Sequence, residues 1–332
     1  MAVVSGCSGG LDTGGIDPGG GGGAMTAGTG GASGSGGVAP GSGGATQASG
    51  GAPVGGAGTA GRASGGAASA GRAGTGGMPA VGGGAATGGG GAGGGGTPAN
   101  LCQWPTPVGP DEMVSKTIAV SGMYDGGMKR FVGAGALGSS GQTEDQGPLF
   151  DVANGGTLQN VILGNPAADG VHCAGTCTLK NVWWEDVGED AATLKGALAT
   201  QTMTIDGGGA NHASDKVFQH NGPGTMVIKN FCAQDFGKLY RSCGNCTTQY
   251  ARHVQLENVR IIPGSGTSAL VGVNTNYNDT ATFKAIAIQA RANALTICQR
   301  YTGNDTGAEP PKNGAGADGT VCVYAPTDIT WQ

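Results

Sequence analysis

Charged residues are scarce in this 332-residue sequence, which holds 17 Lys and Arg against 22 Asp and Glu and has a net charge of −5. A chain with so few basic residues lacks the positive surface that nucleic-acid binding requires, so we expect no nucleic-acid partner. Long hydrophobic runs are missing as well, because no apolar stretch approaches the roughly 20 residues of a membrane-spanning helix. No transmembrane span is therefore expected.

Glycine, in contrast, is abundant, and 42 of the 73 glycines lie in the first 100 residues. That stretch has only four charges and little to bury, so it cannot offset the entropy lost on ordering. Its Gly/Ala/Ser/Thr composition is typical of a flexible linker, and the lack of a Gly-X-Y period excludes collagen. We predict a long disordered Gly-rich segment over residues 8–100 and one globular domain over residues 101–332.

The nine cysteines indicate an exported protein, secreted or extracellular. Residues 4–7 (VSGC) match the small-residue pattern of a bacterial lipoprotein cleavage site, which would make residues 1–7 the end of a signal and Cys7 a lipid anchor on the cell surface. Only six residues precede Cys7, so an accidental match stays open as the alternative.

The other eight cysteines are expected to form disulfides. We propose only local pairs: Cys173–Cys177, Cys243–Cys246 and Cys298–Cys322. The CxxxC and CxxC spacings leave a zinc site built from the first two pairs as the competing interpretation.

A short strand-like pattern recurs in the globular domain. Residues 157–161 (TLQNV) return as residues 178–182 (TLKNV), and looser copies place apolar markers at Leu158, Leu179, Ile205, Ile228 and Leu256. No helical pattern of ten or more residues separates the copies, and the L-x-x-L-x-L of leucine-rich repeats is absent. The repeat predicts an all-β fold, a right-handed single-stranded parallel β-helix, with its Asn positions stacked as a hydrogen-bonded ladder.

Acidic residues follow two successive repeats. Asp169 follows one strand, and Glu185, Asp186, Glu189 and Asp190 follow the next. Equivalent corners of neighbouring coils lie about 5 Å apart, so their carboxylates would repel unless a cation lay between them. Calcium prefers such oxygen ligands, and the alternative is that these acids are merely solvated turn residues.

Four of the 15 basic residues of the globular domain lie in the same region: Lys195, Lys216, Lys238 and Arg241. A partly desolvated Lys flanked by other cations loses proton affinity and can act as a base, whereas Arg suits bidentate contact with a carboxylate. These parts fit β-elimination from a uronic acid, in which a base removes the C5 proton and calcium and Arg neutralise the adjacent carboxylate. The neighbouring Trp183 and Trp184 alternate, so we expect one in the core and one toward solvent or sugar.

Long motifs in this region resemble polysaccharide lyase family 3, the small pectate lyases. They include residues 167–173 (AADGVHC), 184–193 (WEDVGEDAAT), 215–222 (DKVFQHNG) and 235–246 (DFGKLYRSCGNC). The resemblance implies a parallel β-helix and calcium-dependent eliminative cleavage of polygalacturonate, or pectin. The segment at residues 302–319 reads as a loop that this family does not require.

The resemblance also implies roles for individual residues. It makes Lys216 the base that abstracts the C5 proton and Arg241 its catalytic partner at the substrate carboxylate. It places substrate-binding residues at Lys195, Lys238 and Glu144, and the Ca²⁺ ligands at Asp169, Glu189 and Asp190.

Two other functions remain open from the sequence. A β-helical polygalacturonase-type hydrolase would use paired carboxylates as acid and base and would not need Lys216. A non-catalytic pectin-binding surface protein would keep the groove without the reaction. In each case we expect a monomer.

Overall fold

The computed structural model describes residues 101–143 and 146–332, so the predicted linker, Cys7 and Glu144 lie outside the described residues. Within these ranges no helix is long and apolar enough to cross a membrane. The helical elements described are short 3-10 turns: η1 (Gly135–Leu137), η2 (Thr275–Tyr277) and η3 (Pro326–Asp328).

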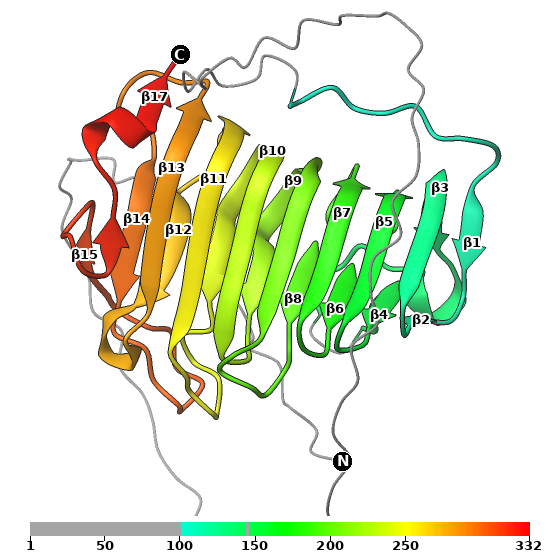
Figure 1. The fold of residues 1–332 in the computed structure, drawn as a ribbon, viewed down its shortest axis with the longest axis horizontal. Helices are drawn as coiled ribbons and strands as arrows, with labels where there is room; N and C mark the ends of the chain where they lie inside the picture. The colour runs from blue at the N-terminus through cyan, green and yellow to red at the C-terminus, as the bar shows by residue number, and fades with distance from the viewer. Residues whose placement is uncertain (1–100, 144–145) are drawn as a thin grey trace, which may run out of the picture. The chain divides into compact units, whose positions relative to one another are not determined.

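Strands make up most of the described chain (Figure 1). In chain order they are β1 (Glu112–Val114), β2 (Ile118–Val120), β3 (Met123–Gly133), β4 (Phe150–Val152), β5 (Gly156–Leu163), β6 (Val171–Cys173), β7 (Cys177–Trp184), β8 (Ala192–Leu194), β9 (Thr202–His220), β10 (Gly224–Ser242), β11 (Arg252–Ile262), β12 (Ala269–Asn274), β13 (Thr280–Ile288), β14 (Thr296–Tyr301), β15 (Lys312–Ala315), β16 (Cys322–Val323) and β17 (Ile329–Trp331).

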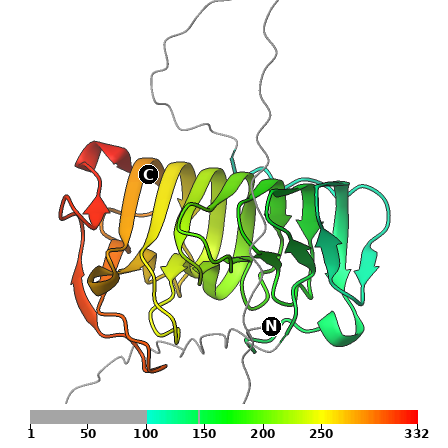
Figure 2. The same cartoon turned by 60° about the horizontal axis from the view of Figure 1, so that its bottom comes forward.

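The chain winds around three parallel sheets, called here the first, second and third faces, and each turn of the chain adds one strand segment, or rung, to each face. The first halves of β5 and β7 pair on the first face, and their second halves pair on the second face. Strands β4, β6 and β8 pair on the third face. The long strands β9 and β10 continue across all three faces. The rungs lie side by side in two views (Figures 1 and 2), and only β15 pairs antiparallel among the strands described. The predicted parallel β-helix is confirmed.

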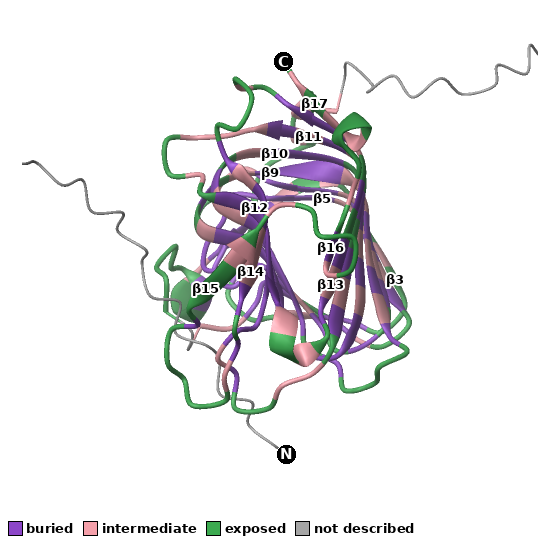
Figure 3. Ribbon diagram, turned by 90° about the vertical axis from the view of Figure 1, so that its left-hand side faces the viewer, coloured by how far each residue is buried: buried purple, intermediate pink, exposed green. Residues whose placement is uncertain are grey.

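The apolar markers of the repeat form one continuous stack inside the first face. Leu158, Leu179, Ile205, Ile228 and Leu256 are direct register partners from rung to rung. Their side chains are fully or almost fully buried, and buried segments line all faces when the stack is viewed from the end that carries β13 and β14 (Figure 3). Each such side chain contributes about 1.5–3 kcal/mol by leaving water, so the period of the sequence is the period of the core.

Asparagines mark the corner between the first and second faces. Asn160, Asn181, Asn230 and Asn258 have φ values of 54°, 54°, 55° and 55°, a left-handed conformation that Asn tolerates better than most residues. Asn181 donates to Asn160 at 2.9 Å and Asn258 donates to Asn230 at 2.8 Å. Asn230 donates instead to Asp206, so the predicted ladder exists in two segments.

The disulfides bear out the three predicted local pairs, Cys173–Cys177, Cys243–Cys246 and Cys298–Cys322. Because the first two pairs are disulfides, the competing zinc interpretation is wrong. The fourth bond, Cys102–Cys232, joins residues 130 positions apart and was not predicted, because no local spacing marks it.

This fourth disulfide fixes the N-terminal arm, residues 101–107, to the outside of the second face. Trp104 packs edge-on against Trp183 with 5.1 Å between ring centroids, and its Nε1 donates to Gln234 at 2.7 Å. Trp184 is in the core, as expected for one of the pair, but Trp183 is only 7% exposed. The expectation that it faces solvent or sugar is wrong, because the arm covers it.

The two kinds of disulfide should differ in their effect on stability. Replacing Cys102 and Cys232 by Ala should lower the free energy of unfolding by about 5 kcal/mol, because this bond closes the longest loop in the unfolded chain. Replacing Cys173 and Cys177, which are 4 positions apart, should cost about 2 kcal/mol. Denaturant titration of both variants measures the difference, and equal losses would contradict it.

A buried histidine should make stability depend on pH. Burial lowers the pKa of His220 to about 3, and its Nδ1 lies 2.8 Å from the Tyr240 hydroxyl. The unfolded chain gains this proton near the ordinary pKa, so stability should fall as the pH drops from about 6.5 toward about 3, by up to about 1.4 kcal/mol per pH unit. Denaturant titrations across this pH range measure the free energy of unfolding, which should change less steeply with pH for His220→Gln than for the parent protein. The same pH dependence in both proteins would show that His220 does not cause it.

Candidate active site

Three carboxylates meet at the corner between the second and third faces. Asp169 immediately precedes the rung of β6, and Glu189 and Asp190 precede β8 on the next rung. Gly170 has φ +46°, and a Cβ there would collide with the Ala191 carbonyl oxygen, so only Gly lets the two rungs approach this closely. One oxygen from each of the three acids lies within 4.8 Å of the others.

The cluster has the properties of a cation site. All three acids are buried, and Asp169 Oδ1 and Asp190 Oδ1 accept no hydrogen bond from the described residues. Burial raises the pKa of the Asp190 carboxyl well above its usual range; the Lys216 charge opposes this, and the Glu189 charge adds to it. Asp169 Oδ1 has no partner among the described residues, and the Lys216 ammonium is 3.6 Å from Asp190 Oδ1, so carboxylate oxygens at this spacing fit a hard divalent ion such as calcium.

The other acids of this segment point elsewhere. Glu185 pairs with Arg130 at 2.7 Å, and Asp186 accepts a hydrogen bond from Asn165 at 2.5 Å. His172 joins the cluster, with its Nε2 2.5 Å from Asp169 Oδ2. His172 lacks a metal-binding spacing such as HExxH and was expected to be packed or hydrogen-bonded; its contact with the acid cluster was not predicted, although its position three residues after Asp169 was a usable signal.

Lys216 lies against the acids from the next rung, in β9. Its Nζ is 3.0 Å from Asp215, 3.3 Å from Glu189 and 3.6 Å from Asp190, and the residue is only 5% exposed. Burial alone favours the neutral amine, but these carboxylates outweigh it and raise the pKa of Lys216 well above its usual range. The sequence suggested cations beside Lys216, but its direct charged contacts are acids.

The other predicted lysines flank this centre. Lys238 is the register partner of Lys216 on β10, and its Nζ lies 3.5 Å from Asp215, which thus bridges the two lysines. Lys195, just after β8, lies 3.9 Å from Asp169 and is partly exposed. Asp215 was visible beside Lys216 in the sequence, but its bridging position depends on register and was missed.

Arg241 follows three residues after Lys238 on the third face. It is 8% exposed, and its Nη1 donates to the Ser242 carbonyl at 2.7 Å and to Asn274 Oδ1 at 3.1 Å. Its guanidinium carbon lies 4.0 Å from the centre of the Tyr301 ring. Burial lowers the pKa of Arg241, yet a guanidinium keeps its charge in proteins. The sequence analysis missed Asn274 and Tyr301, which come from rungs one and two turns later.

Fold and site together define a parallel β-helix protein whose neighbouring rungs carry an acid cluster, paired lysines and an arginine. The family model described as "Pectate lyase" matches residues 102–308. The chain belongs to this family.

Curated relatives and solved structures agree with this assignment. The chain is 47% identical over 210 residues to "Probable pectate lyase D" of Emericella nidulans, which covers 63% of this chain and 76% of that one. The catalytic domain of pectate lyase PelI from Erwinia chrysanthemi aligns with a TM-score of 0.58 and 30% identity, covering 67% of this chain and 100% of that chain. Pectate lyase Pel3 from Pectobacterium carotovorum aligns with a TM-score of 0.54 and 26% identity, covering 67% of this chain and 69% of the other.

The acid cluster predicts stabilisation by calcium. At about 100 times the dissociation constant, calcium should add about 2.7 kcal/mol to the free energy of unfolding, visible as a higher melting temperature. Asp190→Asn should abolish most of this shift, because the amide removes a charged ligand.

Asp206→Asn is the matched control. Asp206 pairs with Lys229 at 3.1 Å on a different corner, so its variant should keep the calcium shift. The cation site would be disproved if calcium left the melting temperature of each of the three proteins, the parent and the two variants, unchanged.

Proposed function

We propose that this protein is a calcium-dependent pectate lyase that cleaves polygalacturonate by β-elimination. The observation that carries the proposal is Lys216 buried beside three clustered carboxylates, in a chain that belongs to the pectate lyase family. The related pectate lyase PelI, to which this chain is 30% identical with a TM-score of 0.56, has a structure in complex with tetragalacturonic acid. That complex supports the same class of substrate here.

Asp169, Glu189 and Asp190 are the residues that would hold the cation, because their oxygens converge and two of these oxygens accept no hydrogen bond from the described residues. Bound calcium supplies positive charge that offsets these acids and withdraws electrons from a uronate carboxylate. His172 fixes one oxygen of Asp169. Glu144 is proposed as a further substrate-binding residue.

Lys216 is the proposed base. Once the charge of the neighbouring acids is offset, burial of its side chain favours the neutral amine, which can take the C5 proton of a uronate. The C5–H electrons then form the C4–C5 double bond as the C4–O bond breaks, and the departing sugar oxygen gains a proton. Lys238, linked to Lys216 through Asp215, adds positive charge beside the reacting carbon.

Arg241 is the proposed partner of the substrate carboxylate. Its guanidinium remains charged, and removal of the C5 proton increases the negative charge on that carboxylate. Lys195, partly exposed beside Asp169, is placed to meet a further carboxylate of the polymer. The groove thus meets a polyanion with separate cations.

We further propose that the protein acts outside the cell as a monomer. The four disulfides of the described domain support an oxidising compartment. A lipid anchor at Cys7 and the linker over residues 8–100 would let the domain reach an insoluble polymer while it stays with the cell.

Elimination creates an unsaturated uronide, so polygalacturonate should show rising ultraviolet absorbance with this protein and calcium. Chelator should abolish the rise, and Lys216→Ala should lower kcat by at least about a thousandfold because the base is lost. Lys229→Ala removes a lysine paired with Asp206 away from the groove and should keep the parent rate.

Other outcomes point to the alternatives. New reducing ends without absorbance, with Lys216→Ala still active, would indicate hydrolysis. Calcium-dependent binding without any product would indicate a pectin-binding protein.

A further inference from the structure

The hydrogen bonds of Arg241 leave one edge of its guanidinium unpaired. Both Nη1 protons have protein acceptors, the Ser242 carbonyl and Asn274 Oδ1. No residue in the described ranges accepts a hydrogen bond from its Nε or Nη2. That edge carries the two parallel N–H groups that suit a carboxylate, and the hydrogen bonds within the protein use only the other side of the guanidinium.

The orientation of the Asn274 amide is fixed by its surroundings. Its Nδ2 donates to Ser242 Oγ at 3.1 Å and to the Cys243 carbonyl at 2.9 Å, so Oδ1 must be the atom that faces Arg241. Ser242 Oγ in turn donates to Asp279 Oδ2 at 2.5 Å, and the Asn274 backbone N–H donates to the same oxygen at 2.8 Å. These three side chains are fully buried, and the network gives the amide a single orientation.

Asn274 is also a neutral acceptor. A carboxylate in contact with the Nη1 group would pair with the guanidinium and offset its charge, whereas an amide oxygen orients the group and leaves the charge intact. The buried Asp279 makes its hydrogen bonds to Ser242 and the backbone, so Asp279 and Glu309 act on the Arg241 charge without bonding to the guanidinium. The hydrogen bonds that orient Arg241 therefore come from neutral groups.

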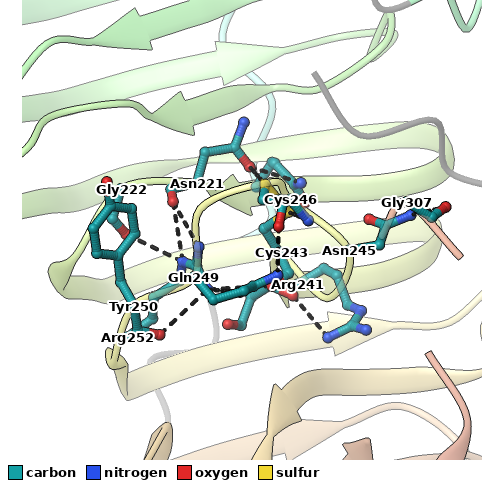
Figure 4. Close-up of a disulfide and its surroundings, with 12 residues drawn as sticks. Asn221, Gly222, Arg241, Cys243, Asn245, Cys246, Gln249, Tyr250, Arg252 and Gly307 are labelled. Carbon is teal, nitrogen blue, oxygen red and sulfur yellow. Dashed lines mark hydrogen bonds between the residues drawn. A yellow bond between two sulfur atoms is a disulfide. The ribbon is translucent and has the colours of Figure 1, made fainter. Parts of the chain in front are cut away.

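Two further contacts confine the guanidinium plane. Tyr301 covers one face, with 4.0 Å from the guanidinium carbon to the ring centre. A Cβ at Gly244 would collide with both Arg241 Nη2 and Pro310, so the turn closed by Cys243 and Cys246 approaches the arginine as closely as glycine allows. Figure 4 shows Arg241 beside this turn.

The segment over residues 302–319, which was predicted as a loop and contains β15, is hydrogen-bonded to the same turn. The backbone N–H of Asn304 donates to the Gly244 carbonyl at 2.7 Å, and Asn245 Nδ2 donates to the Gly307 carbonyl at 3.2 Å (Figure 4). Gln249 Nε2 also donates to the Asn304 carbonyl at 2.7 Å. The loop thus braces the wall against which Arg241 lies.

We propose that Asn274 and Tyr301 are positioning residues for Arg241, which hold its Nε–Nη2 edge toward a uronate carboxylate. This inference rests on the proposed function, because it assigns the substrate carboxylate to that edge. Neither residue needs to touch the substrate. Their effect should pass through Arg241 and vanish when Arg241 is absent.

A double-mutant cycle on the full chain tests this dependence. Asn274→Ala should lower kcat/KM for polygalacturonate by about ten- to a hundredfold, the usual effect of one lost hydrogen bond to a charged group, and mainly through kcat. In the Arg241→Ala background the same substitution should change kcat/KM by less than about twofold. Tyr301→Leu should behave in the same way, whereas Tyr301→Phe keeps the ring over the guanidinium and most of the activity.

Asn258→Ala is the matched control for loss of stability. Asn258 makes a hydrogen bond to Asn230 in the ladder at another corner, so its variant should melt at a lower temperature with kcat unchanged. If Asn274→Ala behaved like this control, or lowered kcat/KM equally with and without Arg241, the positioning role would be overturned. An inactive parent protein would count against the proposed function alone. In that case the double-mutant cycle would be repeated on the affinity for trigalacturonate, measured by calorimetry with calcium. The positioning role would then require that Asn274→Ala weaken binding only when Arg241 is present.

Discussion

Parallel stacking in direct register is the constraint on which this structure depends. Side chains at equivalent corners of successive rungs lie about one strand spacing apart whether they attract or repel. At one corner this spacing joins asparagine amides, which hydrogen-bond to one another. At the corner that carries Asp169, Glu189 and Asp190 it gathers like charges out of water, so that corner needs positive charge in order to persist.

Lys216 supplies part of that charge and links the fold to the chemistry. Its ammonium is buried against carboxylates from two rungs, and removal of one partner from such a pair is typically destabilising by about 3–5 kcal/mol. The same contacts raise the pKa of Lys216 and so oppose the neutral amine that a base requires. A divalent cation held by Asp169, Glu189 and Asp190 would supply positive charge that offsets these acids.

The acid cluster and Arg241 are held in different ways. The acid cluster relies on charge balance between close carboxylates and Lys216. Arg241 is held directly by neutral groups, namely an amide oxygen, a backbone carbonyl and an aromatic ring, while the carboxylates of Asp279 and Glu309 act on its charge without a hydrogen bond to it. This difference suits a reaction that needs a deprotonated amine at one point and a permanent positive charge at another.

The sequence allowed prediction of features that repeat or lie close along the chain. The spacing of Leu158, Leu179 and Ile205 predicted the rungs, and the local disulfides followed from cysteines 3, 4 and 24 positions apart. The acid cluster was predicted because its members share equivalent corners, although the roles of the site residues remain predictions. Features that depend on which distant segments meet were missed, namely the Cys102–Cys232 bond, the cover over Trp183 and the contacts that hold Arg241.

The direct contacts of Lys216 were mispredicted for a related reason. In the sequence its nearest recognisable partners were other cations, but the β9 rung turns its side chain onto the acids of the preceding rung. Charge along a chain indicates which groups are available, and register decides which of them touch.

A crystal structure determined with calcium tests the central claim most directly. The account predicts one ion bonded to oxygens of Asp169, Glu189 and Asp190 at about 2.3–2.6 Å, with Lys216 Nζ withdrawn from the last two carboxylates. Density without an ion at millimolar calcium, with Lys216 still paired to both acids, would contradict it.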